Sequence, residues 1–124
     1  MANELNAATV WMFLRETQLP KDVSEMFVEG EQAYAAYATI RDVAVFTNKR
    51  LIVRDAQGIS GTKLEIYSMP WSSVDMWSSE NAGVIDATAE VELWTRSGHY
   101  KINLKRDVDV RKIDQLIAYF VLNR

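Results

Sequence analysis

Between Tyr34 and Leu104, apolar residues recur at every second position, in short runs that are separated by turn residues. Period two is the spacing of a strand with one buried face, because successive side chains of a strand point to opposite sides of the sheet. The runs are also rich in β-branched and aromatic residues, which favour strands. The pattern predicts about seven antiparallel strands around one core.

A hairpin is predicted where Asn48 and Lys49 separate two apolar runs, 43–46 and 51–53, which follow an earlier strand at 34–40. A two-residue turn brings apolar side chains of the two runs together on one face of the sheet. The expected pairs are Phe46 with Leu51 and Ala44 with Val53.

The clearest hairpin signal is Ser97-Gly98, which we expect to be the turn between strands 90–96 and 99–105. Counting outward from that turn gives one apolar and one polar face. The apolar face is expected to pair Thr95 with Tyr100, Leu93 with Ile102 and Val91 with Leu104. The polar face is expected to pair Trp94 with Lys101, Glu92 with Asn103, and Glu90 with Lys105 as a candidate ion pair.

Two further strands are expected between these hairpins. A polar turn at 55–61 precedes a strand that contains Leu64 and Ile66 and ends at Met69-Pro70, and a further strand is expected from Trp71 to about Ser79. In this interpretation Leu64 and Ile66, like Val74 and Met76, face the core.

Helices are expected at both ends of the chain. Residues 5–18 carry Val10, Phe13 and Leu14 at helical spacing, and a short second turn is expected to run to Phe27 and end at Gly30. After Asp109, a candidate N-cap, a helical stripe begins. Its members are Val110, Ile113, Leu116, Ile117 and Phe120.

These elements predict a mainly β protein with α-helices: a seven-stranded, bent antiparallel β-sandwich or barrel that is capped by a C-terminal helix and preceded by an N-terminal helical leader. With 124 residues the chain has the size of a single domain. We expect the leader at 1–30, the sandwich at 31–107 and the capping helix at 108–124.

Composition excludes several function classes. The net charge of −3 gives no overall positive field for nucleic acid. The chain has no cysteine, so disulfides and thiolate chemistry are excluded. No apolar run is long enough to span a bilayer, and the first residues lack the basic start of a signal peptide. We therefore expect a cytoplasmic protein.

Residues 41–52, RDVAVFTNKRLI, resemble the bacterial pleckstrin-homology (PH) domain family. The turn from Asp55 to Lys63, the segment Met69 to Val74, and the closing segments Glu92-Leu93-Trp94 and Val108-Asp109-Val110 continue the resemblance. It covers nearly the whole chain and is most convincing from Arg41 to Leu122.

The resemblance implies a seven-stranded bent sandwich, a capping C-terminal helix, a tendency to form ring-shaped homo-oligomers and no assigned enzymatic activity. Eukaryotic relatives often bind phosphoinositides through basic residues in a long first hairpin loop. Here that junction is Ile40-Arg41-Asp42, where a single arginine beside an acid cannot make several phosphate contacts. The closing helix has Tyr119 and Phe120 where eukaryotic members usually have tryptophan.

No catalytic or cofactor site is predicted. His99 is the only histidine and borders a turn, and the serines at 72–73 and 78–79 have no nucleophile-elbow sequence. Glu90 and Glu92 alternate onto one face, where cross-strand lysines explain them more simply than acid–base chemistry does. Gly58 and Gly61 have neither phosphate-loop nor dinucleotide spacing. We therefore expect no enzyme, metal or cofactor.

Three aromatic residues are expected to point away from the core: Tyr67, Trp77 and Trp94. Either the leader helix covers them, or they form a contact with another subunit or a partner, where Trp and Tyr are favoured. Together with the resemblance, they predict a non-catalytic, self-associating binding or scaffold module with an unidentified protein partner. The alternative is a peripheral membrane module that binds anionic headgroups, for which the candidate contacts are Lys49, Arg50 and Arg54.

Overall fold

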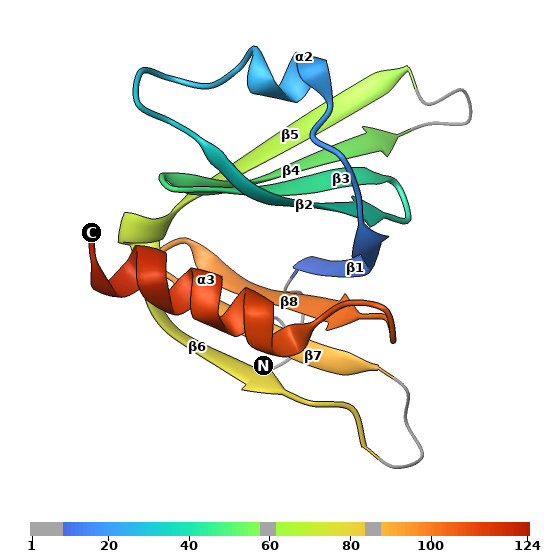
Figure 1. Ribbon diagram of the computed structural model, residues 1–124, viewed down its shortest axis with the longest axis vertical. Coiled ribbons are helices and arrows are strands. Elements are labelled where there is room, and N and C mark those ends of the chain that lie inside the picture. The colour runs from blue at the N-terminus through green and yellow to red at the C-terminus, as the bar shows by residue number, and fades with distance from the viewer. Residues whose placement is uncertain (1–8, 58–61, 84–87) are drawn as a thin grey trace.

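The structure, a computed structural model, describes residues 9–57, 62–83 and 88–124. This part of the chain contains eight strands, two α-helices and one 3₁₀ turn (Figure 1). In chain order they are β1 (Thr9–Glu16), α2 (Lys21–Ser24), β2 (Ala33–Thr39), β3 (Asp42–Thr47), β4 (Arg50–Gln57), β5 (Lys63–Pro70), η1 (Trp71–Ser73), β6 (Val74–Glu80), β7 (Ala89–Thr95), β8 (Gly98–Leu104) and α3 (Val110–Leu122).

The strands form one open sheet in the order β5-β4-β3-β2-β1-β8-β7-β6. The sheet bends into two layers, with β2 to β5 in one and β6 to β8 in the other (Figure 1). β1 joins the layers, because it pairs antiparallel with β2 and parallel with β8. The predicted bent sandwich with a C-terminal helix is confirmed, but the described residues form eight strands and not seven.

The additional strand is β1, so the predicted helical leader is wrong over Thr9–Glu16. Trp11 and Phe13 are buried while Val10 is 55% exposed, which is the alternation of a strand. The same apolar residues also fit a helical stripe, and pairing with β2 and β8 decides between the two periods. Residues 5–8 of the expected helix lie outside the described residues.

The hairpin formed by β3 and β4 is confirmed, with Ala44 opposite Val53 and Phe46 opposite Leu51. The hairpin of β7 and β8 has a different register from the predicted one, because its turn is Arg96-Ser97 and Thr95 pairs with Gly98.

The hydroxyl of Thr95 explains this turn, because it accepts from the Ser97 amide at 3.1 Å and donates to the Gly98 carbonyl at 2.9 Å. Gly98 itself has a φ of +152°, which glycine adopts readily. The shift of two residues keeps each side chain on its predicted face but changes its partner. Glu90 consequently forms its ion pair with Lys101, at 3.4 Å, and not with Lys105.

The two strands at the ends of the sheet also differ from the prediction. On β5 the inward residues are Tyr67 and Met69, whereas Leu64 and Ile66 are 52% and 42% exposed. The predicted strand from Trp71 begins with η1, and only Val74–Glu80 is extended.

An irregularity between Val74 and Met76 then reverses the alternation in β6. As a result Val74 is buried and Met76 is 53% exposed.

The core lies between the two layers, and α3 closes it by packing on β6, β7 and η1 (Figure 1). Ile113, Ile117 and Phe120 are buried, and Val110 and Leu116 pack at the margin, as the stripe predicts. Asp109 is the N-cap, since its carboxylate accepts from the amides of Arg111 and Lys112.

A smaller apolar cluster covers the outer face of β2 to β4, where Val23 of α2 is fully buried against Val45 and Ile52. The predicted short helical turn before Gly30 is therefore present, although the helix itself ends at Ser24. Strands β2 to β4 are therefore covered on both faces. The accessible sheet surface consists of the outer face of β6 to β8 and the two edge strands, β5 and β6.

Candidate functional site

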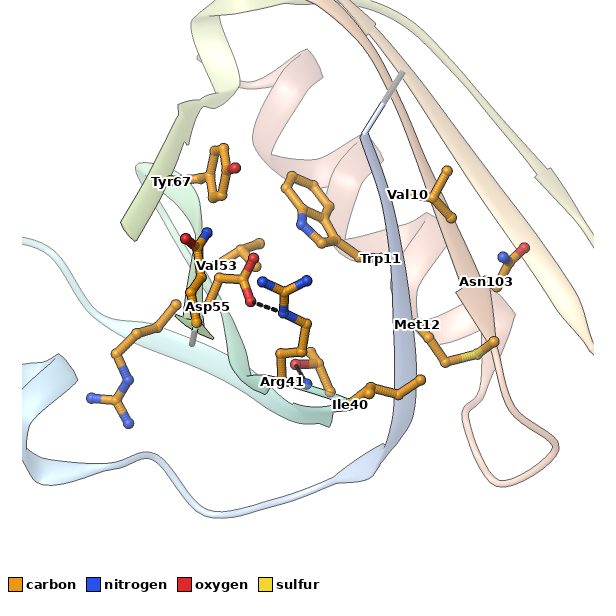
Figure 2. A pocket seen from close by; sticks show the side chains of 12 residues that line it. Val10, Trp11, Met12, Ile40, Arg41, Val53, Asp55, Tyr67 and Asn103 are labelled. Carbon is orange, nitrogen blue, oxygen red and sulfur yellow. Dashed lines mark hydrogen bonds and ion pairs between the residues drawn. The ribbon is translucent and has the colours of Figure 1, made fainter. Parts of the chain in front are cut away.

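A pocket of about 500 Å³ opens between β1, the β2–β3 junction and the inner sides of β4 and β5 (Figure 2). We call it the end pocket. Its polar wall is formed by Arg41 and Asp55, its aromatic wall by Trp11 and Tyr67, and its rim by Val10 and Ile40. The rim side chains are exposed, 55% for Val10 and 68% for Ile40, so the pocket combines an apolar entrance with a charged interior.

Asp55 lies on β4, two residues beyond the inward-facing Val53, so it also faces the inside of the bent sheet. Figure 2 shows its carboxylate joined to Arg41, whose Nε lies 2.7 Å from an Asp55 oxygen. The two partners differ in exposure, because the Asp55 side chain is 14% exposed and that of Arg41 is 56% exposed. The acid is therefore a fixed part of the wall, and the arginine reaches it from solvent.

The aromatic wall is built by rings from different strands. The ring of Trp11 lies edge to face with that of Tyr67, with centroids 5.7 Å apart, and stacks on Tyr100 at 5.4 Å. Burial, together with a hydrogen bond to Glu65, raises the pKa of Tyr67 above its usual range. The phenol therefore stays neutral at physiological pH and offers a polar, uncharged group beside Asp55.

The second feature is the pair of sheet ends. Among the described strands, β5 pairs only with β4 and β6 pairs only with β7, so each has a free edge of backbone donors and acceptors. Exposed apolar side chains lie on both, namely Leu64 and Ile66 on β5 and Met76 on β6. Trp94 is directly opposite Met76 and so lies on the same face.

Trp94 is held by an adjacent polar group. The ring of His99 stacks on it at 4.8 Å, and His99 Nε2 lies 2.7 Å from a Glu92 carboxylate oxygen. A hydrogen bond between the two glutamates raises the pKa of Glu90 and lowers that of Glu92, and His99 and Lys101 further lower the latter. On the outer face of β7 and β8, ring stacking and hydrogen bonds therefore fix the side chains around Trp94.

Only one of the three predicted contact residues lies on that outer face. Tyr67 and Trp77 pack against the core, and the indole of Trp77 donates to Asp114 of α3 at 3.0 Å. In β5 and β6, the alternate residues that face the core are the opposite of those predicted. The two aromatic residues therefore point inward, and Leu64, Ile66 and Met76 point outward. Trp94 lies on the outer face as expected.

The three candidate anion contacts do not form one cluster. Arg50 binds the buried carboxylate of Glu31, and Arg54 is paired with both Asp42 and Asp22. Within the described residues, Lys49 is the one of the three without a carboxylate partner. Arg50 and Arg54 lie on the same face of β4, but each is paired with acids from other segments, and this pairing was not visible in a count of basic residues.

Sequence reasoning identified neither Trp11 nor the pair Arg41 and Asp55 as parts of a site. The sequence contained one signal that Asp55 faces inward. Continuing the predicted pairing of Ala44 with Val53 by two residues places Asp55 opposite Asp42, on the same side of β4 as Val53. The contact with Arg41 depends on the shape of the β2–β3 junction and has no counterpart in the sequence pattern.

Other classes of site are not built in the described part of the chain. Residues 9–57, 62–83 and 88–124 contain no group of three or more His, Asp or Glu side chains that could hold a metal ion. In the same ranges, no helix has the length and apolarity to cross a bilayer.

The eight-stranded bent sheet with its capping helix defines a protein of the PH type, and the sequence agrees. The profile of the bacterial PH domain family matches residues 5–121, so this chain belongs to that family. It is 34% identical over 116 residues to the uncharacterized protein YjqA of Bacillus subtilis strain 168, with 91% of this chain and 90% of that protein covered. A second relative from that strain, the uncharacterized protein YozO, is 27% identical over 98 residues.

Two solved structures are also similar. One is a DUF1696 family protein with a pleckstrin-homology domain from Shewanella loihica PV-4, with a TM-score of 0.79, 36% identity, and coverage of 86% of this chain and 96% of that one. The other is a pleckstrin homology domain from Shewanella amazonensis SB2B, with a TM-score of 0.65, 35% identity, and coverage of 81% and 82%.

Proposed function

We propose that this chain is a non-catalytic binding module of the cytoplasm that assembles with copies of itself and presents one ligand surface repeatedly. The observation that carries the proposal is the presence of exposed Leu64, Ile66 and Met76 on the two strands whose edges are free. Free edges with outward apolar residues favour pairing with another chain.

The two ends differ in sequence, and this favours a ring. If β5 of one copy meets β6 of the next, the contact is heterologous, and such contacts close into a ring when the rotation per subunit allows it. Trp94 lies beside Met76 on the β6 side and would enlarge the contact. The proposed contact set is therefore Leu64, Ile66, Met76 and Trp94, with Tyr67 and Trp77 serving the core.

Repetition supplies the functional reason for such an assembly. A partner with several binding segments would engage several copies, so that weak single contacts add up to strong attachment. The partner is proposed to be a protein, since the cations expected to attract anionic lipid are mostly neutralised: Arg50 by Glu31, and Arg54 by Asp42 and Asp22.

Charge substitutions at the two edges test the proposal. Ile66→Lys and Met76→Lys place a charge in the proposed contact. Ile40→Lys is the matched control, because Ile40 is 68% exposed at the β2–β3 junction, and β2 and β3 lie in the middle of the sheet order. Light scattering should give a smaller mass for each edge variant and no change for the control. If all three variants keep the mass of the parent protein, the edges are not the contact.

A further inference from the structure

We propose that the end pocket is a receptor for a guanidinium group, and that Arg41 occupies it as a competitor built into the chain. This inference concerns the ligand of one subunit and does not depend on how copies assemble. It starts from the ion pair between Arg41 and Asp55, in which the acid is part of the pocket wall and the base comes from the exposed β2–β3 junction.

The acid provides the charge that selects a cation. Asp55 is 14% exposed, and a carboxylate accepts two parallel hydrogen bonds from a guanidinium. The neighbouring Arg54 does not neutralise it, because its guanidinium binds Asp42 and Asp22. Asp55 therefore has no partner from Arg54, and its charge is unpaired in the wall whenever Arg41 turns away.

The rings provide the shape. Trp11 and Tyr67 line the same pocket as Asp55, and aromatic faces attract cations, with planar guanidinium groups also able to stack on them (Figure 2). At about 500 Å³ the pocket exceeds the size of a guanidinium, and exposed Val10 and Ile40 at the rim suit the aliphatic stem that carries it. The site thus matches an alkylguanidinium better than a bare inorganic ion.

Arg41 has the properties of a displaceable occupant. Its side chain is 56% exposed, and ion pairs with an exposed partner contribute little to stability. As part of the same chain it nevertheless competes with a high effective concentration, of millimolar order. A free guanidinium should therefore bind the parent protein weakly and bind several-fold more tightly once the Arg41 side chain is removed.

The experiment is a titration with ethylguanidinium chloride, followed by NMR at the indole N–H of Trp11 and the amide of Asp55. Arg41→Ala should bind the probe several-fold more tightly than the parent, up to about sixfold, which is the competition that an ion pair of about 1 kcal/mol can exert. Arg41→Ala combined with Asp55→Asn should lose that gain. Arg111→Ala, which removes an exposed arginine of α3, is the matched control and should behave as the parent. Tetramethylammonium, which cannot donate two parallel hydrogen bonds, should bind Arg41→Ala more weakly than the probe.

A titration with N-acetylarginine N-methylamide identifies the source of the group. Tighter binding than ethylguanidinium indicates an arginine in a protein, weaker binding indicates a small metabolite, and both results support the receptor. If Arg41→Ala binds ethylguanidinium no more tightly than the parent, the proposal is overturned. Arg41→Gln, which keeps a polar stem, repeats the comparison should the alanine variant fail to fold.

Discussion

The guanidinium of Arg50 holds the buried carboxylate of Glu31 with two hydrogen bonds, 2.8 Å from Nε and 3.0 Å from Nη2. Thr47 donates to the same carboxylate at 2.7 Å, and the amide of Val28 donates at 3.0 Å. The Glu31 side chain is 0% exposed and the Arg50 side chain 19%. This cluster ties the segment after α2 to the β3–β4 hairpin.

Glu31→Ala should lower the free energy of unfolding by about 3–5 kcal/mol, because it leaves a mostly buried arginine without its partner. Urea denaturation measures this change. Glu29→Ala is the control, since Glu29 is exposed two residues away. A loss below about 1 kcal/mol for Glu31→Ala, the value of a surface ion pair, would contradict the role given to this cluster.

The same carboxylate predicts how stability depends on pH. Burial alone would raise the pKa of Glu31, but the hydrogen bonds from Arg50, Val28 and Thr47 outweigh burial and hold the pKa below its usual 4.5. A lowered folded pKa means that the stabilisation is complete above about pH 4.5 and is lost as pH falls through the folded pKa.

Urea titrations at several pH values should therefore show a steeper loss of stability below pH 4.5 for the parent than for Glu31→Gln, which has no carboxylate to protonate. Parallel curves for the two proteins across this range would show that Glu31 titrates alike in the folded and unfolded states.

Trp77 is expected to serve stability and not assembly. Its indole donates to Asp114 at 3.0 Å and so fastens β6 to α3. Trp77→Phe keeps most of the packing but removes a hydrogen bond to a carboxylate, which is worth about 1.5–3 kcal/mol. Thermal unfolding should occur at a lower temperature while light scattering gives an unchanged mass. A lower mass with unchanged stability would place Trp77 at a subunit contact instead.

Binding to anionic membranes is expected to be weak. Of the three candidate headgroup contacts, Arg50 and Arg54 are paired with acids, and Lys49 alone provides little attraction. Sedimentation with phosphatidylserine vesicles at low salt should leave the protein in the supernatant. Enrichment in the pellet that Lys49→Ala abolishes would favour the membrane alternative.

The sequence predicted those elements whose apolar spacing fits only one of the two periods, that of a helix or that of a strand. The stripe Ile113, Ile117 and Phe120 fits a helix alone, and the Ala44 and Val53 pair follows from the length of one turn. Thr9–Glu16 fits both periods, and its assignment depends on β2 and β8, which are distant in the chain. Long-range pairing of that kind is not encoded in local spacing.

The candidate site was less predictable than the fold. Whether Leu64 and Met76 are exposed depends on which alternate residues of β5 and β6 face the core. A single irregularity after Val74 exchanges the inward and outward positions of β6. The end pocket needs Trp11, Arg41 and Asp55 to converge from two strands and a junction. In the sequence, each of these residues fits an ordinary strand or turn position, and only the bend of the sheet brings them together.

The free edges of β5 and β6 are proposed to join copies of this chain. Size-exclusion chromatography with light scattering, on the unmodified protein at micromolar concentration, tests this claim. We expect one species with a mass several times 14.2 kDa. A single peak at the mass of one chain, unchanged on concentration, would contradict the claim.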